Sequence, residues 1–553
     1  MAVSDAGYVG SEACAACHQP IYDSYRKTSM GQSMSPITPA LIGKMAVPAT
    51  FYDARQDRHY DIYAKDGALY QSEYQKDATG REVFRTIGRL SWIVGSGSNI
   101  RGGIVERSGY LFEAPMALYT ATGKWSWAPG YASADYSFSR PVLAGCIVCH
   151  SGRAHAVEGT NGEYDKKVFS EISIGCENCH GPGRAHIEAM SGGECRSAPG
   201  EDCIVNPAML KPELANNLCM GCHQIGDERV LQPYKSYSDL RPGEPLGKTL
   251  AIFMVPPRKE SPPDSDHLQH VYSMMLSRCY RASGGRLRCI SCHDPHIRVT
   301  AQEAPAFYRE RCLTCHTEQS CGLPMAARRK QNPSDNCIGC HMQRRPVAFM
   351  AHTSLTNHRI LATPDEALPS SMFHATTAAL PDLINLDPVP GEESKEPPLL
   401  TLLTAYGELS AFRPEYREPY LRVLDRLEIS QPENPLVEAA VGRRDLAQGR
   451  IEQAIDHLER AINRGATAAT ACADLSAAFE RHGDADAALH AQQQAVRLDP
   501  WNPLLQKALI ALLIRQKRYA DASAALDRYM AAFPQDSFMR QLQAKATAVS
   551  AAP

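Results

Sequence analysis

The chain has 553 residues, a formal net charge of −3 and 22% charged residues. This length corresponds to two to four domains, and the near-neutral charge gives no support for nucleic-acid binding. The longest apolar runs, such as the one that begins near Ala508, are far shorter than the roughly 20 residues of a membrane-spanning helix. The 19 cysteines are therefore the feature that a functional interpretation must explain.

Seven copies of the pattern Cys-x-x-Cys-His account for 14 of the 19 cysteines. Structural zinc sites need such cysteine pairs two at a time and no adjacent histidine, and a thioredoxin-like dithiol needs one copy in a βαβ setting. The pattern is typical of covalently bound haem c, in which two cysteines form thioethers and the adjacent histidine binds the iron. Seven copies therefore predict seven haem c groups.

The motifs are numbered 1 to 7 in chain order. Their cysteine pairs are Cys14 and Cys17, Cys146 and Cys149, Cys176 and Cys179, Cys219 and Cys222, Cys289 and Cys292, Cys312 and Cys315, and Cys337 and Cys340. The predicted proximal ligands are His18, His150, His180, His223, His293, His316 and His341.

Residues 1–360 are predicted to form a seven-haem cytochrome c domain, mostly α with little regular structure. A haem-free, β-rich insertion is expected at 46–140, because "HYDIYAKDGALYQSEYQ" alternates apolar and polar residues around Lys65, Asp66 and Gly67 and so predicts a small β-hairpin or sheet. From Cys146 to His341 six motifs lie close together, and the segments between them are too short to build an ordinary core. The porphyrins are expected to supply the apolar bulk there.

The last part of the chain changes in composition. Residues 361–398 are Pro-rich, which predicts a linker or a surface strap. Residues 399–548 repeat at 34-residue steps, as Ala454, Ala488 and Ala522 show, and this is the period of a tetratricopeptide repeat. We therefore expect an all-α repeat solenoid after the haem domain, with Cys472 packed between its helices.

Distal iron ligands are predicted from histidines outside the motifs. A short tether does not easily fold back over its own haem, so these histidines are expected to bind the irons of neighbouring motifs. Hydrogen bonding to a propionate or to the backbone is the alternative for each of them, and it is favoured for His59, His267 and His374. The six predicted distal ligands are His155, His186, His270, His296, His352 and His358.

Motif 1 has no histidine near it, so a methionine is predicted as its distal ligand. Met30 is preferred over Met34, because His/Met ligation is common in c-type haems; the alternative is that both methionines belong to the core. Six histidines and one methionine then serve seven irons. This count leaves no iron open to a substrate and favours electron transfer over catalysis.

The sequence also predicts partners for the remaining cysteines and for a basic cluster. Outside the cytoplasm disulfides are permitted, so Cys195–Cys203 and Cys279–Cys321 are proposed as bonds, with free buried thiols as the alternative. The basic residues near motif 7 are expected to pair with haem propionates. These residues are Arg328, Arg329, Lys330, Arg344 and Arg345.

Several longer stretches carry a family resemblance. They include "YVGSEACAACHQPIYDSYRKTSMGQSM", "GCENCHGPGRAH" and "CIGCHMQRRPVAFMAHTSLTNHRI". The chain resembles multihaem cytochromes c related to the tetrahaem electron carriers of ammonia oxidisers, in the branch with a C-terminal tetratricopeptide repeat domain. The resemblance implies stacked and perpendicular haem pairs and a periplasmic or extracellular location. Since the first residues lack the features of a signal peptide, such a signal is expected to have been cleaved or replaced.

The preferred function is a multihaem cytochrome c that carries electrons along seven haems. Its repeat domain would dock a redox partner protein, a larger electron-transfer complex or another subunit. One alternative is a reductase of a small nitrogen or sulfur oxyanion, or of a hydroxylamine-type substrate, at one five-coordinate haem. Another is a subunit of an extracellular cytochrome filament, assembled through head-to-tail contacts.

Overall fold

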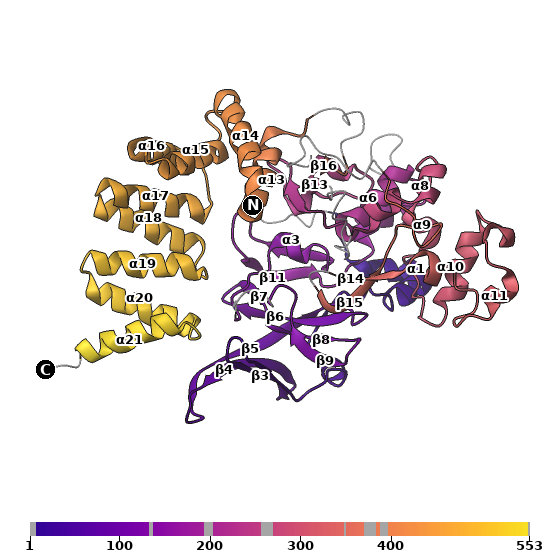
Figure 1. The fold of residues 1–553 in the computed structure, drawn as a ribbon, viewed down its shortest axis with the longest axis horizontal. Coiled ribbons are helices and arrows are strands. Elements are labelled where there is room, and N and C mark those ends of the chain that lie inside the picture. Colours follow the sequence, from indigo (N-terminus) through magenta and orange to yellow (C-terminus); the bar gives the residue numbers. More distant parts are fainter. Residues whose placement is uncertain are drawn as a thin grey trace.

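The computed structural model describes residues 7–131, 137–192, 203–255, 269–347, 350–369, 383–387 and 396–550. Three parts are visible in Figure 1: a β-sheet formed by the early part of the chain, a region of short helices, and a column of paired helices at the C-terminal end. Most of the predicted Pro-rich linker lies outside the described residues, as do Cys195, His267 and His374.

The β-rich region is confirmed, and it is larger than the predicted hairpin. Nine strands form one antiparallel sheet whose main path runs β2-β3-β4-β5-β6-β8-β9, with β1 paired to β5 and β7 paired to β6. The strands are β1 Met34–Pro36, β2 Ala49–Asp53, β3 Arg58–Lys65, β4 Ala68–Lys76, β5 Glu82–Val94, β6 Ile100–Arg107, β7 Tyr110–Glu113, β8 Met116–Tyr119 and β9 Lys124–Trp127.

The predicted hairpin is the β3–β4 pair. Its two-residue turn has Asp66 at φ 50° and Gly67 at φ 71°, the positive angles that a type I′ turn requires. Apolar residues on one face of these strands, including Tyr60, Ile62 and Leu69, are almost completely buried. The alternation that predicted the hairpin therefore also builds the core of the sheet.

The motif region consists of short helices and a few short strands. The helices are α1 Ser11–Tyr25, α2 Pro39–Ile42, α3 Ala144–Ile147, α4 Glu177–His180, α5 Arg184–Met190, α6 Pro212–His223, α7 His270–Met275, α8 Arg278–Ala282, α9 Cys289–Cys292, α10 Ala304–Leu313, α11 Met325–Arg329 and α12 Cys337–His341. The strands are β10 Arg153–Ala156, β11 Tyr164–Glu171, β12 Glu228–Leu231, β13 Leu250–Met254, β14 Arg344–Val347, β15 Met350–Thr356 and β16 Ile384–Asn385. Each motif lies on or at the end of one of these helices, and a helical turn brings its two cysteines to one side.

The C-terminal part is an all-α repeat array. Its helices are α13 Leu399–Phe412, α14 Arg417–Ser430, α15 Pro435–Ala447, α16 Ile451–Asn463, α17 Ala469–His482, α18 Ala485–Leu498, α19 Pro503–Arg515, α20 Tyr519–Ala532 and α21 Ser537–Ser550. Ala454, Ala488 and Ala522 occupy equivalent buried positions on α16, α18 and α20, where a small side chain lets paired helices approach. Cys472 is fully buried in a cluster with Ala495 and Leu505, as predicted.

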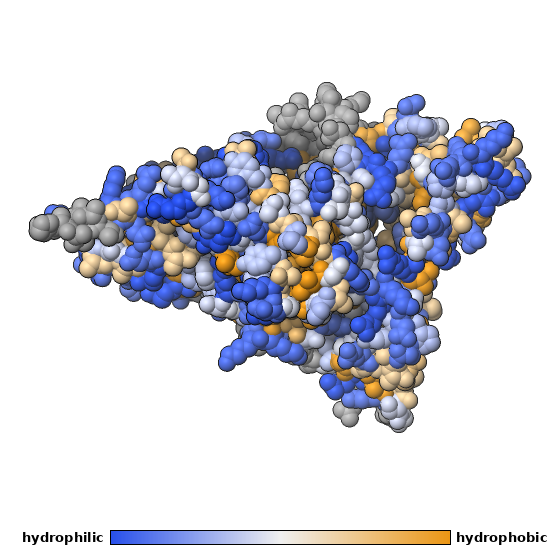
Figure 2. Space-filling model, turned by 90° about the horizontal axis from the view of Figure 1, so that it is seen from below, coloured by the Kyte–Doolittle hydropathy of each residue, from blue (hydrophilic) through white to orange (hydrophobic). Residues whose placement is uncertain are grey.

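The repeat helices contact the rest of the molecule at more than one place along their column. At one end α13 and α14 share a core with β12 and β13, which includes Val230, Phe253 and Leu424. Farther along, the ring of Trp501 meets that of Phe112 at 5.3 Å in an edge-to-face arrangement. Figure 2 shows a largely hydrophilic surface with apolar side chains gathered in the middle of the face seen from below.

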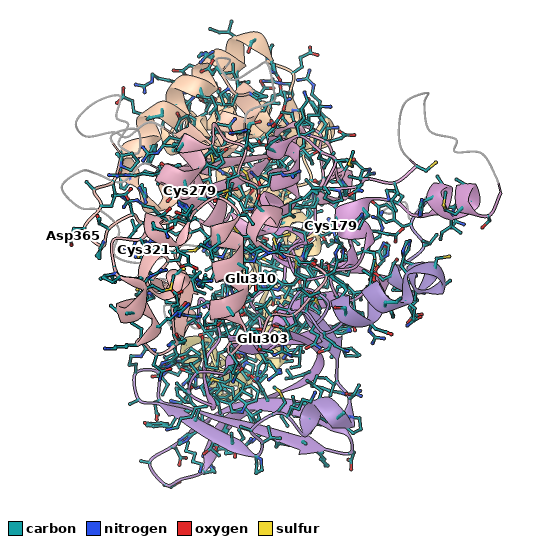
Figure 3. The ribbon with its side chains drawn as sticks, turned by 90° about the vertical axis from the view of Figure 1, so that its right-hand side faces the viewer. Cys179, Cys279, Glu303, Glu310, Cys321 and Asp365 are labelled. Atoms are coloured by element: carbon teal, nitrogen blue, oxygen red, sulfur yellow. The ribbon has the colours of Figure 1, made fainter. Side chains whose placement is uncertain are left out.

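One predicted disulfide is wrong. Cys279 and Cys321, both labelled in Figure 3, are free thiols. Their pairing rested on compartment and cysteine number, and neither of these supplies the Cα separation of about 4.4–6.8 Å that a disulfide needs. Cys203 is disulfide-bonded, but its predicted partner lies outside the described residues.

Candidate functional site

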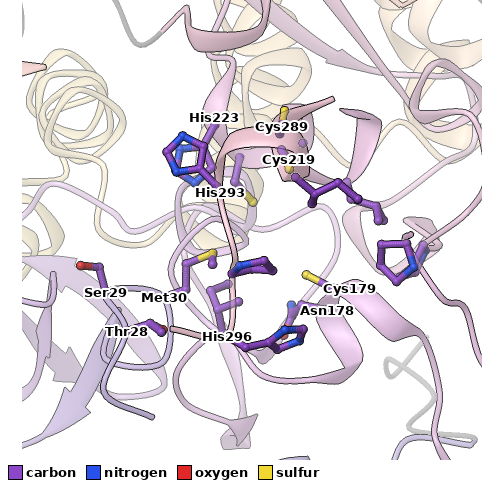
Figure 4. Close-up of a pocket in the computed structure, with 18 of the residues that line it drawn as sticks. Thr28, Ser29, Met30, Asn178, Cys179, Cys219, His223, Cys289, His293 and His296 are labelled. Atoms are coloured by element: carbon purple, nitrogen blue, oxygen red, sulfur yellow. The ribbon is translucent and has the colours of Figure 1, made fainter. Parts of the chain in front are cut away.

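A single large cavity runs through the motif region. Its volume is about 2860 Å³, and residues from all seven motifs line it. A pocket for a drug-sized molecule measures roughly 300–1,000 Å³, so this cavity has room for several large groups. Figure 4 shows Cys179, Cys219 and Cys289 around it together with His223, His293 and His296. The motif cysteines that line it are Cys14, Cys17, Cys149, Cys176, Cys179, Cys219, Cys222, Cys289, Cys292, Cys312 and Cys337.

Two motif histidines each have a second imidazole opposite them. The ring centroids of His18 and His186 are 6.4 Å apart with planes at 17°, and those of His180 and His296 are 6.1 Å apart at 18°. A metal–imidazole bond is about 2.0–2.1 Å long. Two imidazoles on opposite sides of one metal therefore have centroids roughly 6 Å apart, counting about 1 Å from nitrogen to centroid in each ring.

Four more histidines form a chain between motifs 4 and 5. His223 lies 5.7 Å from His270 at 16°, and His293 lies 6.1 Å from His358 at 32°. The two histidines outside the motifs, His270 and His358, are in contact at 4.2 Å. The structure thus brings four of the predicted distal histidines, His186, His270, His296 and His358, beside a motif histidine.

Hydrogen bonds to Nδ1 orient several of these rings. Nδ1 lies 2.8 Å from the Val205 carbonyl oxygen in His180, 2.6 Å from the Leu361 carbonyl oxygen in His341 and 2.9 Å from the Thr356 carbonyl oxygen in His358. A carbonyl accepts only from an N–H, so Nε2 is left as the unprotonated nitrogen. This arrangement is usual for metal-binding histidine.

Burial favours the neutral form of four motif imidazoles and of His270. It lowers the pKa of His150, His180 and His223, that of His293 to about 4 and that of His270 to about 2. The neutral imidazole is the form that binds a metal. Within the described chain the buried Nδ1 of His270 also has no hydrogen-bond partner.

The other predicted ligands have different surroundings. Met30 lines the cavity, whereas Met34 is 2% exposed and belongs to the apolar core beside the sheet. His155 forms a hydrogen bond with the hydroxyl of Ser170. The ring of His352 lies 5.4 Å from that of Tyr119 on β8.

Among the basic residues near motif 7, Arg328 lies in a network of ion pairs. Its guanidinium donates to Asp335 at 2.9 Å and to Glu318 at 2.9 Å, and Arg309 pairs with the same two carboxylates. Arg328 is thus paired with carboxylates of the chain itself, and its pairing with a propionate stays a prediction. Arg344 donates to the hydroxyl of Ser354 at 3.0 Å.

Two residues that hold the site together were not predicted. The Glu177 carboxylate, inside motif 3, accepts backbone N–H bonds from Gly10 at 2.8 Å and from Gly183 at 2.7 Å. The Tyr308 hydroxyl lies 3.1 Å from His293 Nδ1. Glu177 fills a variable position of its motif, so the motif pattern carries no signal for it.

A family model described as "Tetratricopeptide repeat" matches residues 479–546. The C-terminal segment is a tetratricopeptide repeat. The search of curated proteins found no match. Within the described residues, no group of three or more His, Cys, Asp or Glu is placed to hold a metal ion, and no described helix is long and apolar enough to cross a membrane.

Several solved structures are similar to part of this chain. YrrB, described as a TPR protein with an unusual peptide-binding site, is 14% identical with a TM-score of 0.25, over 29% of this chain and 82% of its own. MamA from Desulfovibrio magneticus RS-1 is 18% identical with a TM-score of 0.22, over 25% and 78%. The APC/C hetero-tetramer Cut9–Hcn1 is 18% identical with a TM-score of 0.24. The match covers 27% of this chain and 29% of that chain.

Proposed function

We propose that this protein is a multihaem cytochrome c that carries electrons along seven covalently bound haems, and that its tetratricopeptide repeats dock a redox partner. The observation that supports it most directly is the pairing of motif histidines with second imidazoles at 5.7–6.4 Å. Porphyrin nitrogens fill the other positions around a haem iron, so two axial side chains complete it. This explains why pairs of histidines, and not larger clusters, are the relevant donor sets.

The residues of the chain would hold the groups in fixed places. The paired cysteines of each motif would attach the porphyrin, and the motif histidine would bind the iron. His186, His296, His270 and His358 would supply the second imidazole in motifs 1, 3, 4 and 5, so that in motif 1 His186 takes the place predicted for Met30. When bound, haem supplies a reversible one-electron centre. Carbonyls that accept from Nδ1 fix the orientation of the imidazoles.

The proposed location is the periplasm or the cell exterior, where covalent haem attachment takes place in bacteria. The tetratricopeptide repeats support the docking part of the proposal, because stacked helical repeats present extended surfaces that bind proteins. The partner is proposed to be another electron-transfer protein, a larger electron-transfer complex or a second copy of this chain.

The first test is the haem content and ligation of the purified protein. We expect seven haems per chain, measured as the mass added to the polypeptide and by haem absorbance. At least the four haems with paired histidines should give low-spin electron paramagnetic resonance signals and should not bind carbon monoxide. A chain without covalent haem, or carbon monoxide binding at all seven haems, would contradict the proposal.

A matched pair of variants sharpens this test. His296→Ala removes the imidazole opposite His180 and should produce one additional high-spin haem that binds carbon monoxide. The control is His59→Ala, because His59 lies on the sheet between Tyr52 and Tyr74. The control should leave the spectrum unchanged, and a silent His296 variant would disprove the assigned ligand.

A further inference from the structure

The contacts between motifs give an order in space that differs from the order in the sequence. Motif 1 meets motif 3. The backbone N–H of Cys176 donates to the Ser11 hydroxyl at 2.9 Å, and the side chains of Cys14 and Cys176 lie close enough to shift each other's pKa. The first motif thus lies beside the third. Among the described residues, no such contact joins motif 1 to motif 2.

Motif 3 leads on to motif 4. Cys179 is close enough to both cysteines of motif 4, Cys219 and Cys222, to disfavour their thiolate forms. Figure 4 shows Cys179 and Cys219 lining the same pocket. Burial raises the pKa of Tyr25 on α1, and Cys179, Cys176 and Cys222 raise it further, so side chains of motifs 3 and 4 lie near the helix that carries motif 1.

Motif 2 also meets motif 4. The Cys149 thiol donates to the Gly221 carbonyl, inside motif 4, at 3.8 Å. The side chains of Cys149 and Cys222 also lie close enough to shift each other's pKa. The second motif thus contacts the fourth through its second cysteine. Motif 3 contacts the segment after motif 2, where Asn178 donates to the Gly152 carbonyl at 3.0 Å.

A third set of contacts joins motif 4 to motif 5. The backbone N–H of Cys289 donates a hydrogen bond to Asn216 Oδ1 on α6 at 2.9 Å. The chain of imidazoles described above connects His223 to His293 through His270 and His358. Motif 4 thus has contacts with three other motifs: 2, 3 and 5.

From motif 5 the contacts continue to motifs 6 and 7. Tyr308, whose hydroxyl lies 3.1 Å from His293 Nδ1, belongs to α10, the helix that reaches into motif 6. Arg309 on the same helix binds Asp335, just before motif 7, at 2.6 Å, and the Cys312 thiol lies beside that of Cys337. This gives the order 5, 6, 7.

We infer that the haem chain is branched, with the haem of motif 4 as its junction and three arms formed by motif 2, by motifs 3 and 1, and by motifs 5, 6 and 7. The inference rests on the proposed function. The exposed motif cysteines are Cys17, Cys146, Cys315 and Cys340, and each belongs to an arm end or to motif 6. All six cysteines of motifs 3, 4 and 5 are half-buried.

A branched chain has three ends at which electrons can enter or leave, whereas a linear one has two. The molecule would then act as a junction among three redox partners, or between partners and another copy of itself. Every electron that passes from one arm to another would have to pass through the haem of motif 4.

The decisive measurement is the position of each iron in the holoprotein, located by anomalous scattering at the iron absorption edge. We expect the iron of motif 2 to have that of motif 4 as its nearest neighbour, and the iron of motif 4 to have three near neighbours, those of motifs 2, 3 and 5. If the nearest iron to motif 2 belongs to motif 1 or 3, the branch is disproved. A holoprotein with fewer haems than motifs would instead contradict the proposed function.

Haem removal tests the same order in solution. Cys146→Ser with Cys149→Ser removes the motif 2 haem and should shift the midpoint potential of one remaining haem, that of motif 4. Cys219→Ser with Cys222→Ser removes the junction and should shift the potentials of three haems. If the two variants shift the midpoint potentials of equal numbers of haems, the branch is disproved. If the junction variant does not fold, the motif 2 variant decides alone, because the haem whose potential shifts must be that of motif 4.

Discussion

At the scale of single residues, Glu177 connects two motifs that are distant in the sequence. Its carboxylate accepts the backbone N–H bonds of Val9 at 3.0 Å and of Gly10 at 2.8 Å, just before helix α1, while also binding Gly183. The side chain is buried, with 5% of it exposed. This buried carboxylate thus joins motif 3 to the segment before α1 through three backbone donors.

Glu177→Gln should therefore destabilise the protein. The amide keeps the shape but loses the negative charge, and its NH₂ group faces backbone donors. Hydrogen bonds to charged groups contribute about 1.5–3 kcal/mol each, so we expect the free energy of unfolding to fall by about 2 kcal/mol or more. Denaturant unfolding measures this change, and Glu12→Gln, at an exposed position of the same segment, should be neutral. Equal stabilities of the two variants would contradict this role.

At the scale of elements, the contact between β12 and α13 carries two carboxyl groups. Burial and a hydrogen bond with Glu408 on α13 raise the pKa of Glu228 on β12 to about 8. Asp227 further raises this pKa, and Arg413 opposes the rise. The proton on Glu228 therefore helps to hold the repeat helices against the motif region.

This pair predicts a pH dependence. The pKa of Glu228 is raised from 4.5 to about 8 on folding, so the folded state binds more protons than the unfolded state between these values. The stabilisation is complete below about pH 4.5 and is lost as the pH rises through about 8, because stability falls wherever the folded state holds the extra proton.

Thermal unfolding at pH 5, 7 and 9 would check this prediction. The stability of the protein should decrease over this series, and Glu228→Gln should reduce the decrease, since its amide does not titrate. Glu415→Gln, at an exposed position near the end of α13, is the control and should retain the full pH dependence. An unchanged slope in the Glu228 variant would refute the prediction.

At the scale of the whole molecule, the repeat column contacts the sheet as well as the motif region (Figure 1). Trp501 packs on Phe112, Asn161 donates to Asp499 at 3.1 Å, and Arg58 donates to the Gln535 carbonyl at 3.2 Å. These contacts lie far along the column from α13, so the array is attached over much of its length.

Trp501→Ala should loosen this attachment. An aromatic pair contributes about 0.5–1.5 kcal/mol beyond its buried area, so with the lost area we expect a destabilisation of about 2 kcal/mol. Limited proteolysis should cut the variant between the motif region and the repeats faster than the parent. Tyr519→Ala, which removes a ring that is 64% exposed, should not change the cleavage rate.

The sequence by itself determined the features that depend on neighbouring residues. The hairpin turn at Asp66 and Gly67 follows from local backbone preferences, and the repeat array follows from a 34-residue period that is visible in Ala454, Ala488 and Ala522. The cysteine motifs are likewise short patterns, from which haem attachment was predicted and is now proposed.

Only the tertiary structure decided which distant residues meet. His18 and His186, or His180 and His296, are separated by more than a hundred residues, and no local pattern states that their rings face each other. The same holds for the pairing of nine strands, for the free thiols of Cys279 and Cys321, and for the order of the motifs in space. Contacts of this kind depend on how the whole chain packs, because each one is fixed by many weak interactions elsewhere in the fold.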